Sequence, residues 1–229
     1  MKVRIRFSKT GALVYIGHLD VMRYFQKLFV RADIPVAYSE GFSPHQLLGF
    51  SHPLPLGMES VGEYADIVLT RSVPTDEALA RLRAGSVDEI GIYSFNELPE
   101  KCENAMAAVC ASEYLVGFRD EKIHDLEKLV SDLLEKYEIN VIKKTKKSEK
   151  VVNIRPLIFD LHTEDDKLRM MISSGSVDNL KPELVINALT APLEREFTSE
   201  ELIMKRIDQY TSSPDGFVSL DMIGKKIDG

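Results

Sequence analysis

The chain has 229 residues, of which 44% are hydrophobic and 28% are charged, the composition of an ordinary globular protein. No apolar run is long enough for a membrane-spanning helix, and the N-terminus lacks the apolar core of a signal peptide. We therefore expect a cytoplasmic protein with no membrane partner. The formal net charge of −7 opposes indiscriminate binding of polyanions, so that any nucleic-acid site must be a local basic patch.

The first hundred residues predict alternating strands and helices. Residues 2–7 alternate between basic and apolar side chains, which is the period of a half-buried strand. The further elements are expected at 18–32 (helix), 36–38 and 63–70 (strands), 74–85 (helix) and 90–95 (strand). This order is that of the ferredoxin-like fold. The basic face of residues 2–7 is either open to a ligand or sealed by ion pairs, and Asp66 on the neighbouring strand is placed to pair with an arginine.

The same pattern starts again in the second half of the chain. The expected elements are strands at 112–118, 157–159, 168–172 and 201–209, helices at 120–137 and 179–189, and a hairpin around the lysine-rich residues 143–150. We predict an α+β protein of two tandem ferredoxin-like (βαββαβ) units, the second with an elaborated hairpin. The expected domains are residues 1–98 and 112–210, joined by a linker at 99–111 and followed by a mobile tail at 211–229.

Two groups of polar residues in the first half are candidates for ligand binding. His18, Asp20 and Arg23 lie at the start of the first helix, where a histidine contacts a ligand or bonds locally. The second group follows the strand at 36–38 and consists of Ser39, Glu40, Gly41, Phe42, Pro44 and His45. Its phenylalanine is suited either to stacking on a base or to filling the core, and its glycine offers a positive φ.

A basic patch is predicted at the tip of the second-half hairpin. It consists of Lys143, Lys144, Lys146 and Lys147, which would attract phosphate groups or simply form a solvated turn. The two cysteines, Cys102 and Cys110, are too few for an iron–sulfur cluster or a zinc site made from cysteine alone. The motifs of nucleotide-phosphate loops, serine hydrolases and zinc proteases are also absent. We therefore assign no catalytic residue and expect no metal or cofactor.

The segments SKTG and YIGHLDVMRYFQKLFVRADIPVAYSEGFSPHQLLGFSHPLPLGMES (residues 8–11 and 15–60) resemble a known bacterial family. This family is the domain of unknown function fused to the C-terminus of radical-SAM proteins, or encoded alone as a radical-SAM-linked protein. Residues 153–158 and 179–183 are similar to its later signatures, so that the resemblance extends to about residue 210. Gly17 stands where the family usually has serine, and Ser43 stands in a GFNP-like loop.

The resemblance implies an accessory protein, because the iron–sulfur cluster motif of the family belongs to the radical-SAM partner. We therefore expect a binding module without catalytic activity, which recognises RNA or a ribonucleoprotein or docks on a radical-SAM iron–sulfur protein in trans. One alternative is a metal-independent endoribonuclease with His18 or His45 as general acid or base. It rests on a fold-level analogy with the CRISPR repeat-RNA-processing endoribonucleases. The other alternative is a pure interaction scaffold, in which the two polar segments are buried.

Overall fold

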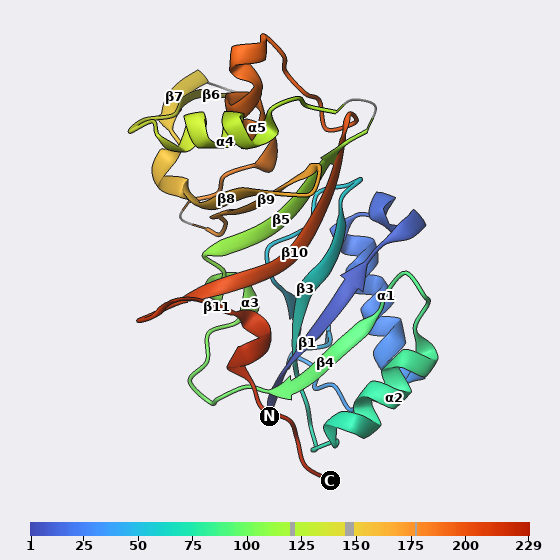
Figure 1. Cartoon of the computed structure of the whole chain (residues 1–229). Coiled ribbons are helices and arrows are strands. Elements are labelled where there is room, and N and C mark those ends of the chain that lie inside the picture. Colours follow the sequence, from blue (N-terminus) through green and yellow to red (C-terminus); the bar gives the residue numbers. More distant parts are fainter. Residues whose placement is uncertain (120–121, 145–148, 177) are drawn as a thin grey trace. The chain divides into compact units, whose positions relative to one another are not determined.

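The computed structural model describes residues 1–119, 122–144, 149–176 and 178–229, with the side chain of Lys144 left out (Figure 1). The chain divides into two compact units, one of residues 1–110 and 208–229 and the other of residues 111–207. Both units combine helices with an antiparallel sheet, and the predicted α+β class is confirmed. No helix in the described part is long and apolar enough to cross a membrane.

The first unit is built around a sheet in the order β4-β1-β3-β2. Its elements are β1 (Lys2–Lys9), η1 (Gly11–Tyr15), α1 (His18–Arg31), β2 (Leu48–Phe50), β3 (Glu59–Val68), α2 (Thr75–Gly85), β4 (Ile92–Glu97), α3 (Ala105–Ala108), β11 (Gly216–Ser219) and η4 (Leu220–Ile223). All three strand pairs are antiparallel. This order of strands is the ferredoxin-like arrangement that the sequence predicts. The expected second strand at 36–38 is wrong, because Val36 and Tyr38 form only isolated bridges and the second strand is β2. The C-terminal part of β10 (Leu202–Ser213) also belongs to this unit.

Helices α1 and α2 cover one face of the sheet of the first unit (Figure 1). The apolar stripe of α1 buries Val21, Phe25, Leu28 and Phe29, which recur at helical spacing. The Phe25 ring lies 4.6 Å from the ring of Phe7 on β1. This aromatic core fixes α1 on the sheet and leaves the opposite side of the helix exposed.

The basic face of β1 is buried at its centre. Arg4 is 2% exposed, and its guanidinium donates to both carboxylate oxygens of Asp66 at 2.8 and 2.9 Å. The two residues are cross-strand partners in the register of β1 with β3, so that the predicted pairing of Asp66 with an arginine is confirmed. The backbone N–H of Ala105 also donates to Asp66, at 2.7 Å. Arg4 is therefore part of the interior, whereas Lys2 on the same face is exposed and Arg6 is partly exposed.

The C-terminal residues 211–229, expected as a mobile tail, instead form the end of β10, β11 and η4. The Ser-Pro-Asp-Gly run is the turn between β10 and β11, a function that short runs of these residue types serve in hairpins. Asp221 in η4 pairs with Arg6 at 3.5 Å, and the backbone N–H of Ile227 donates to the hydroxyl of Thr75 at 2.9 Å. These bonds tie the segment to the first unit.

The expected linker at 99–111 also carries structure. Asn104 caps α3 by accepting a bond from the N–H of Ala107 at 3.0 Å. Ala105 and Ala108 are buried with Tyr64 in a small core of the first unit. The boundary between the two units therefore falls at Cys110 rather than at residue 98.

The second unit repeats the ferredoxin-like order, with its sheet arranged as β10-β5-β9-β8. Its elements are β5 (Ala111–Phe118), α4 (Leu126–Leu134), β6 (Asn140–Lys144), β7 (Glu149–Asn153), η2 (Arg155–Leu157), β8 (Ile158–Glu164), β9 (Lys167–Ser173), α5 (Pro182–Thr190), η3 (Ala191–Leu193) and the N-terminal part of β10. Strands β6 and β7 form a separate two-stranded ribbon, which confirms the elaborated hairpin. Helix α4 is shorter than the 120–137 expected, because Asp125 before it has a left-handed φ of 55°.

A buried tyrosine makes the stability of the first unit depend on pH. The hydroxyl of Tyr64 donates to Asp208, and burial together with this carboxylate raises the pKa of Tyr64 far above its ordinary value. The unfolded chain ionises this phenol near pH 10 whereas the folded chain does not. Its contribution is therefore complete below pH 10 and falls by about 1.4 kcal/mol per pH unit above it.

We expect Tyr64→Phe to cost about 1–2 kcal/mol at pH 7, because Asp208 loses a donor. The difference from wild type should shrink between pH 10 and 11.5. Urea unfolding at pH 7, 10 and 11 measures both effects, with the exposed Tyr15→Phe as the control. Parallel pH profiles of Tyr64→Phe and wild type would contradict this role of Tyr64.

Candidate functional site

The first predicted group, at the start of α1, lies on the surface. Arg23 and Asp20 are both exposed and pair with each other at 3.2 Å. The ring of His18 stands edge-on to Phe50, with 5.3 Å between the ring centroids. Because the Asp20 carboxylate is paired with Arg23, the group presents little net charge to a ligand.

A small cleft lies beside His18. Its volume is about 20 Å³, which is enough for roughly one water molecule. It is lined by Phe7, Lys9, His18, Val21, Phe50, Ser51, Pro53, Leu54 and Glu63. The buried Lys9 donates to the carbonyls of Val14 and Ile16, so that it holds η1 in place. The cleft is too small for a substrate in this structure.

The second predicted group lies in a hairpin of residues 38–47, which directly precedes β2 in the chain. Tyr38 and Gln46 form its β-bridge, and the N–H of Ser39 donates to the carbonyl of His45 at 2.8 Å. The hydroxyl of Ser39 also lies 2.9 Å from Nδ1 of His45. Gly41, with a φ of 108°, forms the tip, where a residue with a Cβ would be strained. Phe42 beside it is fully exposed and does not fill the core.

An open groove of about 720 Å³ lies between the 38–47 hairpin and the outer side of α1. Its lining residues are Gln26, Lys27, Val30, Arg31, Tyr38, Pro44, His45 and Gln46. We call it the α1–hairpin groove. Two of its residues, Pro44 and His45, were predicted site residues, whereas the others were missed.

The α1–hairpin groove is cationic. None of its described lining residues is acidic, although the chain as a whole carries a formal charge of −7. Lys27 has no partner in the described part of the chain, and Arg31 donates to the carbonyl of Gly85 at 3.0 Å. Both lie one helical turn apart, on the same side of α1. An anionic group in the groove would meet both cations.

Gln46 forms a hydrogen bond to Tyr38, the tyrosine that lines the groove. Its side chain is 7% exposed, and its Nε2 donates to the carbonyl of Gln26 and to the hydroxyl of Tyr38, both at 3.3 Å. Its Oε1 is buried and has no hydrogen-bond partner among the described residues. A single glutamine between His45 and Leu47 carries no sequence signal, so that only the structure identifies it.

The structure does not bring the two predicted groups together. His18 and Asp20 lie in the first turn of α1, about 12 and 9 Å along the helix axis before Gln26, where the 38–47 hairpin begins to line the groove. Arg23 is nearer, about 4.5 Å before Gln26, but it does not line the groove. His18 and His45 line different pockets. Within the second group, His45 and Pro44 line the groove, Ser39 bonds to His45, and Glu40, Gly41 and Phe42 occupy the tip of the hairpin.

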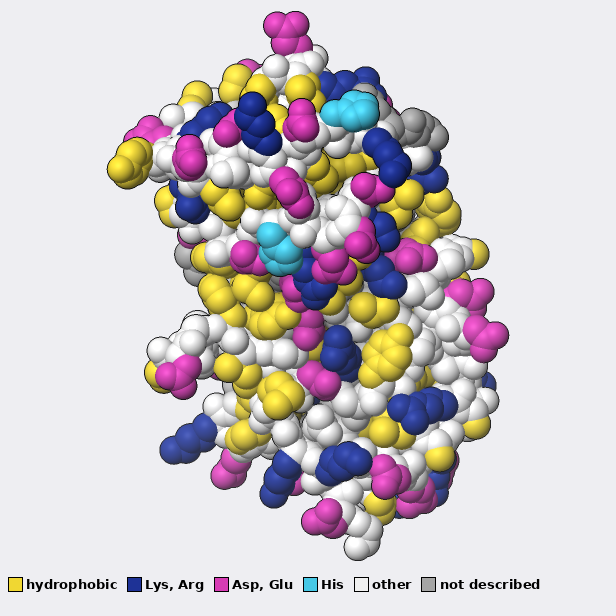
Figure 2. All heavy atoms as spheres, in the orientation of Figure 1, with side chains coloured by type: hydrophobic (Ala, Val, Ile, Leu, Met, Phe, Trp, Pro, Cys, Tyr) yellow, Lys and Arg dark blue, Asp and Glu magenta, His cyan; other side chains and the backbone are white. Residues whose placement is uncertain are grey.

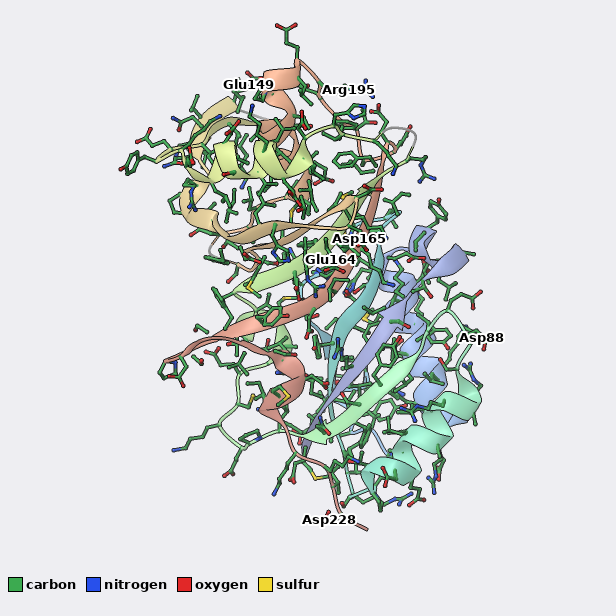
Figure 3. The ribbon with its side chains drawn as sticks, viewed as in Figure 1. Asp88, Glu149, Glu164, Asp165, Arg195 and Asp228 are labelled. Atoms are coloured by element: carbon green, nitrogen blue, oxygen red, sulfur yellow. The ribbon has the colours of Figure 1, made fainter. Side chains whose placement is uncertain are left out.

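The predicted basic patch lies partly outside the described residues, which exclude Lys146, Lys147 and the side chain of Lys144. Lys143 donates to the carbonyl of Asn179 at 3.2 Å. Glu149, labelled in Figure 3, opposes Lys144 in the β6–β7 register. On the face that Figure 2 shows, basic and acidic side chains alternate without an extended basic area. Within the described ranges, no cluster of three or more His, Cys, Asp or Glu residues is arranged to hold a metal ion.

The fold and the site define an α+β protein with two ferredoxin-like units and an open, cation-lined groove on the first unit. The chain belongs to the bacterial family described as "Uncharacterized protein conserved in bacteria (DUF2344)", which matches residues 2–182. This match covers all of the first group, the 38–47 hairpin and α1. No curated protein matches the chain.

Proposed function

We propose that this protein is a binding module that recognises RNA through the α1–hairpin groove and performs no catalysis itself. The observation that supports the proposal is the combination of two cations, the exposed ring of Tyr38 and no described acidic lining residue in one groove. Grooves of this kind bind single-stranded nucleic acid, because cations follow the phosphates and aromatic rings stack on the bases.

The aromatic and cationic parts of the groove have separate effects on affinity. Stacking of a base contributes about 1–3 kcal/mol and hardly depends on salt. Contacts of Lys27 and Arg31 with phosphates release counterions, and two such contacts on a single strand give a slope of about −1.4 in log affinity against log salt. The structure therefore favours modest affinity with a shallow salt dependence.

The test is a fluorescence-anisotropy titration of a labelled 12-nucleotide single-stranded RNA of mixed sequence with the full chain. Between 50 and 200 mM salt we expect the affinity to fall about 7-fold, as a slope of about −1.4 requires. Absence of binding at 50 mM salt would eliminate RNA as the ligand. Electrophoresis of the RNA after the titration tests the endoribonuclease alternative, because it detects cleavage. Cleavage by the wild type that disappears in His18→Ala or His45→Ala would contradict a non-catalytic module.

A second candidate function is docking on a partner protein, for which the resemblance of the sequence suggests a radical-SAM iron–sulfur protein in trans. Three exposed apolar side chains near His18 support it: Tyr15, Leu19 and Leu56. The N–H of Gly57 donates to the carbonyl of Val14 at 3.0 Å, so that the segments that carry them are neighbours. A titration with such a partner tests this function, because Leu19→Asp should weaken the complex.

A further inference from the structure

The α1–hairpin groove contains an aromatic side chain that is exposed and yet held in one orientation. Tyr38 is 55% exposed, and its hydroxyl accepts a bond from Gln46 Nε2 at 3.3 Å. An exposed ring usually loses rotamer freedom when a ligand packs on it, and a ring that is already fixed loses less. Tyr38 is therefore a preorganised apolar surface beside two cations.

The side chain that fixes this ring has its own hydrogen bonding left incomplete. Both amide protons of Gln46 are occupied, one by the carbonyl of Gln26 on α1 and one by the hydroxyl of Tyr38. Its buried Oε1 has no partner in the part of the chain that the structure describes, although such an acceptor is costly to bury. Gln46 thus joins α1 to the Tyr38 side chain through its two amide protons, while its buried acceptor stays without a partner among the described residues.

Resting on the proposed RNA binding, we propose that the groove takes one unpaired nucleotide of a single strand. Tyr38 is the surface on which its base stacks, Lys27 and Arg31 meet its phosphate, and Gln46 is the positioning residue of the Tyr38 ring. A groove of about 720 Å³ is in the range of small-ligand sites. A base paired in a duplex hides its faces in the helical stack, so that only an unpaired base can lie on the ring.

An RNA strand and a free mononucleotide both offer a base and a phosphate, so the experiment tests each of them as a ligand. The ligands are the labelled 12-nucleotide single strand, the same strand annealed to its complement, and AMP as competitor. We expect the full chain to bind the single strand at least 10-fold more tightly than the duplex. Millimolar AMP should displace the strand only partly, because neighbouring nucleotides add contacts at the exposed Phe42.

The variants separate stacking from positioning. Tyr38→Ala should weaken single-strand binding about 5- to 100-fold, the effect of removing one stacked base. Tyr93→Ala, which removes an exposed tyrosine of the same unit outside the groove, should leave it unchanged. Tyr38→Phe and Gln46→Met each break the bond between the two side chains and should each weaken binding about 3-fold. Their double variant should bind no more weakly than Gln46→Met, since the bond that Tyr38→Phe removes is already absent from Gln46→Met.

Each outcome distinguishes the two proposals. If the wild type binds the single strand and Tyr38→Ala binds equally well, the groove assignment is overturned while RNA binding stands. Gln46 does not position the Tyr38 ring if the losses of affinity in the double variant are additive. The same holds if a lower melting temperature of Gln46→Met accounts for its loss of affinity. If the duplex binds as tightly as the single strand, the claim that the groove requires an unpaired nucleotide is wrong. If AMP binds as tightly as the strand, the ligand is a free mononucleotide and not RNA. No binding of the strand at 50 mM salt overturns the proposed function itself.

Discussion

Replacement of Asp66 with alanine should lower the free energy of unfolding by about 3–5 kcal/mol, because it leaves a buried arginine without its counter-charge. The guanidinium of Arg4 is 2% exposed and donates two hydrogen bonds to this carboxylate. The variant also removes the acceptor of the Ala105 N–H, which starts α3. Equilibrium unfolding in urea measures the loss.

The control for Asp66→Ala is Asp33→Asn, which removes the charge of an exposed carboxylate that pairs with Arg71 and Arg81 on the surface. Asparagine is chosen because residue 33 has a positive φ of 50°, which asparagine tolerates better than alanine. Exposed pairs contribute at most about 1 kcal/mol, so this variant should remain close to wild type. Replacing both partners of the buried pair by apolar residues, as in Arg4→Met with Asp66→Leu, should recover most of the loss. Equal stability of Asp66→Ala and Asp33→Asn would show that the buried pair contributes no more than a surface pair.

Reversal of both groove cations, Lys27→Glu with Arg31→Glu, should reduce the affinity for single-stranded RNA at least 30-fold at 50 mM salt. The change replaces two attractions to phosphate by two repulsions and removes the counterion release that accompanies each contact. The same anisotropy titration measures the effect. The melting temperature must be recorded as well, because Arg31 donates to Gly85 and lies over the ring of Tyr24.

The matched control for the groove reversal is Lys101→Glu, which reverses an exposed lysine of the same unit outside the groove. We expect it to change RNA affinity less than 3-fold. If Lys101→Glu weakens binding as much as the groove variant, the loss follows the net charge of the protein and not the groove. The groove would then not be the site.

Much of the first unit follows from local patterns in the sequence. The alternation in residues 2–7 predicts β1, and the helical spacing of Phe25, Leu28 and Phe29 predicts the buried side of α1. Leu19, which falls in the same apolar stripe of the sequence, is exposed. The cross-strand position of Asp66 predicts its pairing with Arg4. The C-terminal segment was not predictable in the same way, because β11 is only four residues long and is held by Asp221 and Ile227 through bonds to residues far away in the chain.

The site was predictable only in part. Gly41 and Pro44 indicate a tight loop, and the structure has a hairpin there. The groove itself depends on how this hairpin packs beside α1, which places Lys27 and Arg31 next to Tyr38. No spacing in the sequence encodes that packing, and Gln46 resembles any other polar strand residue. His18 was selected for its residue type, but its ring contacts Phe50 in a cleft of one water molecule.

The most direct measurement is an amide chemical-shift titration of the isotope-labelled full chain with the 12-nucleotide single-stranded RNA. If the α1–hairpin groove is the RNA site, the large shift changes will lie in residues 26–31 and 38–46. His18 should change little, because it lies about 12 Å before Gln26 along the helix axis. Shift changes concentrated at His18, Asp20 and Arg23, or in the second unit, with residues 38–46 unaffected, would contradict this account.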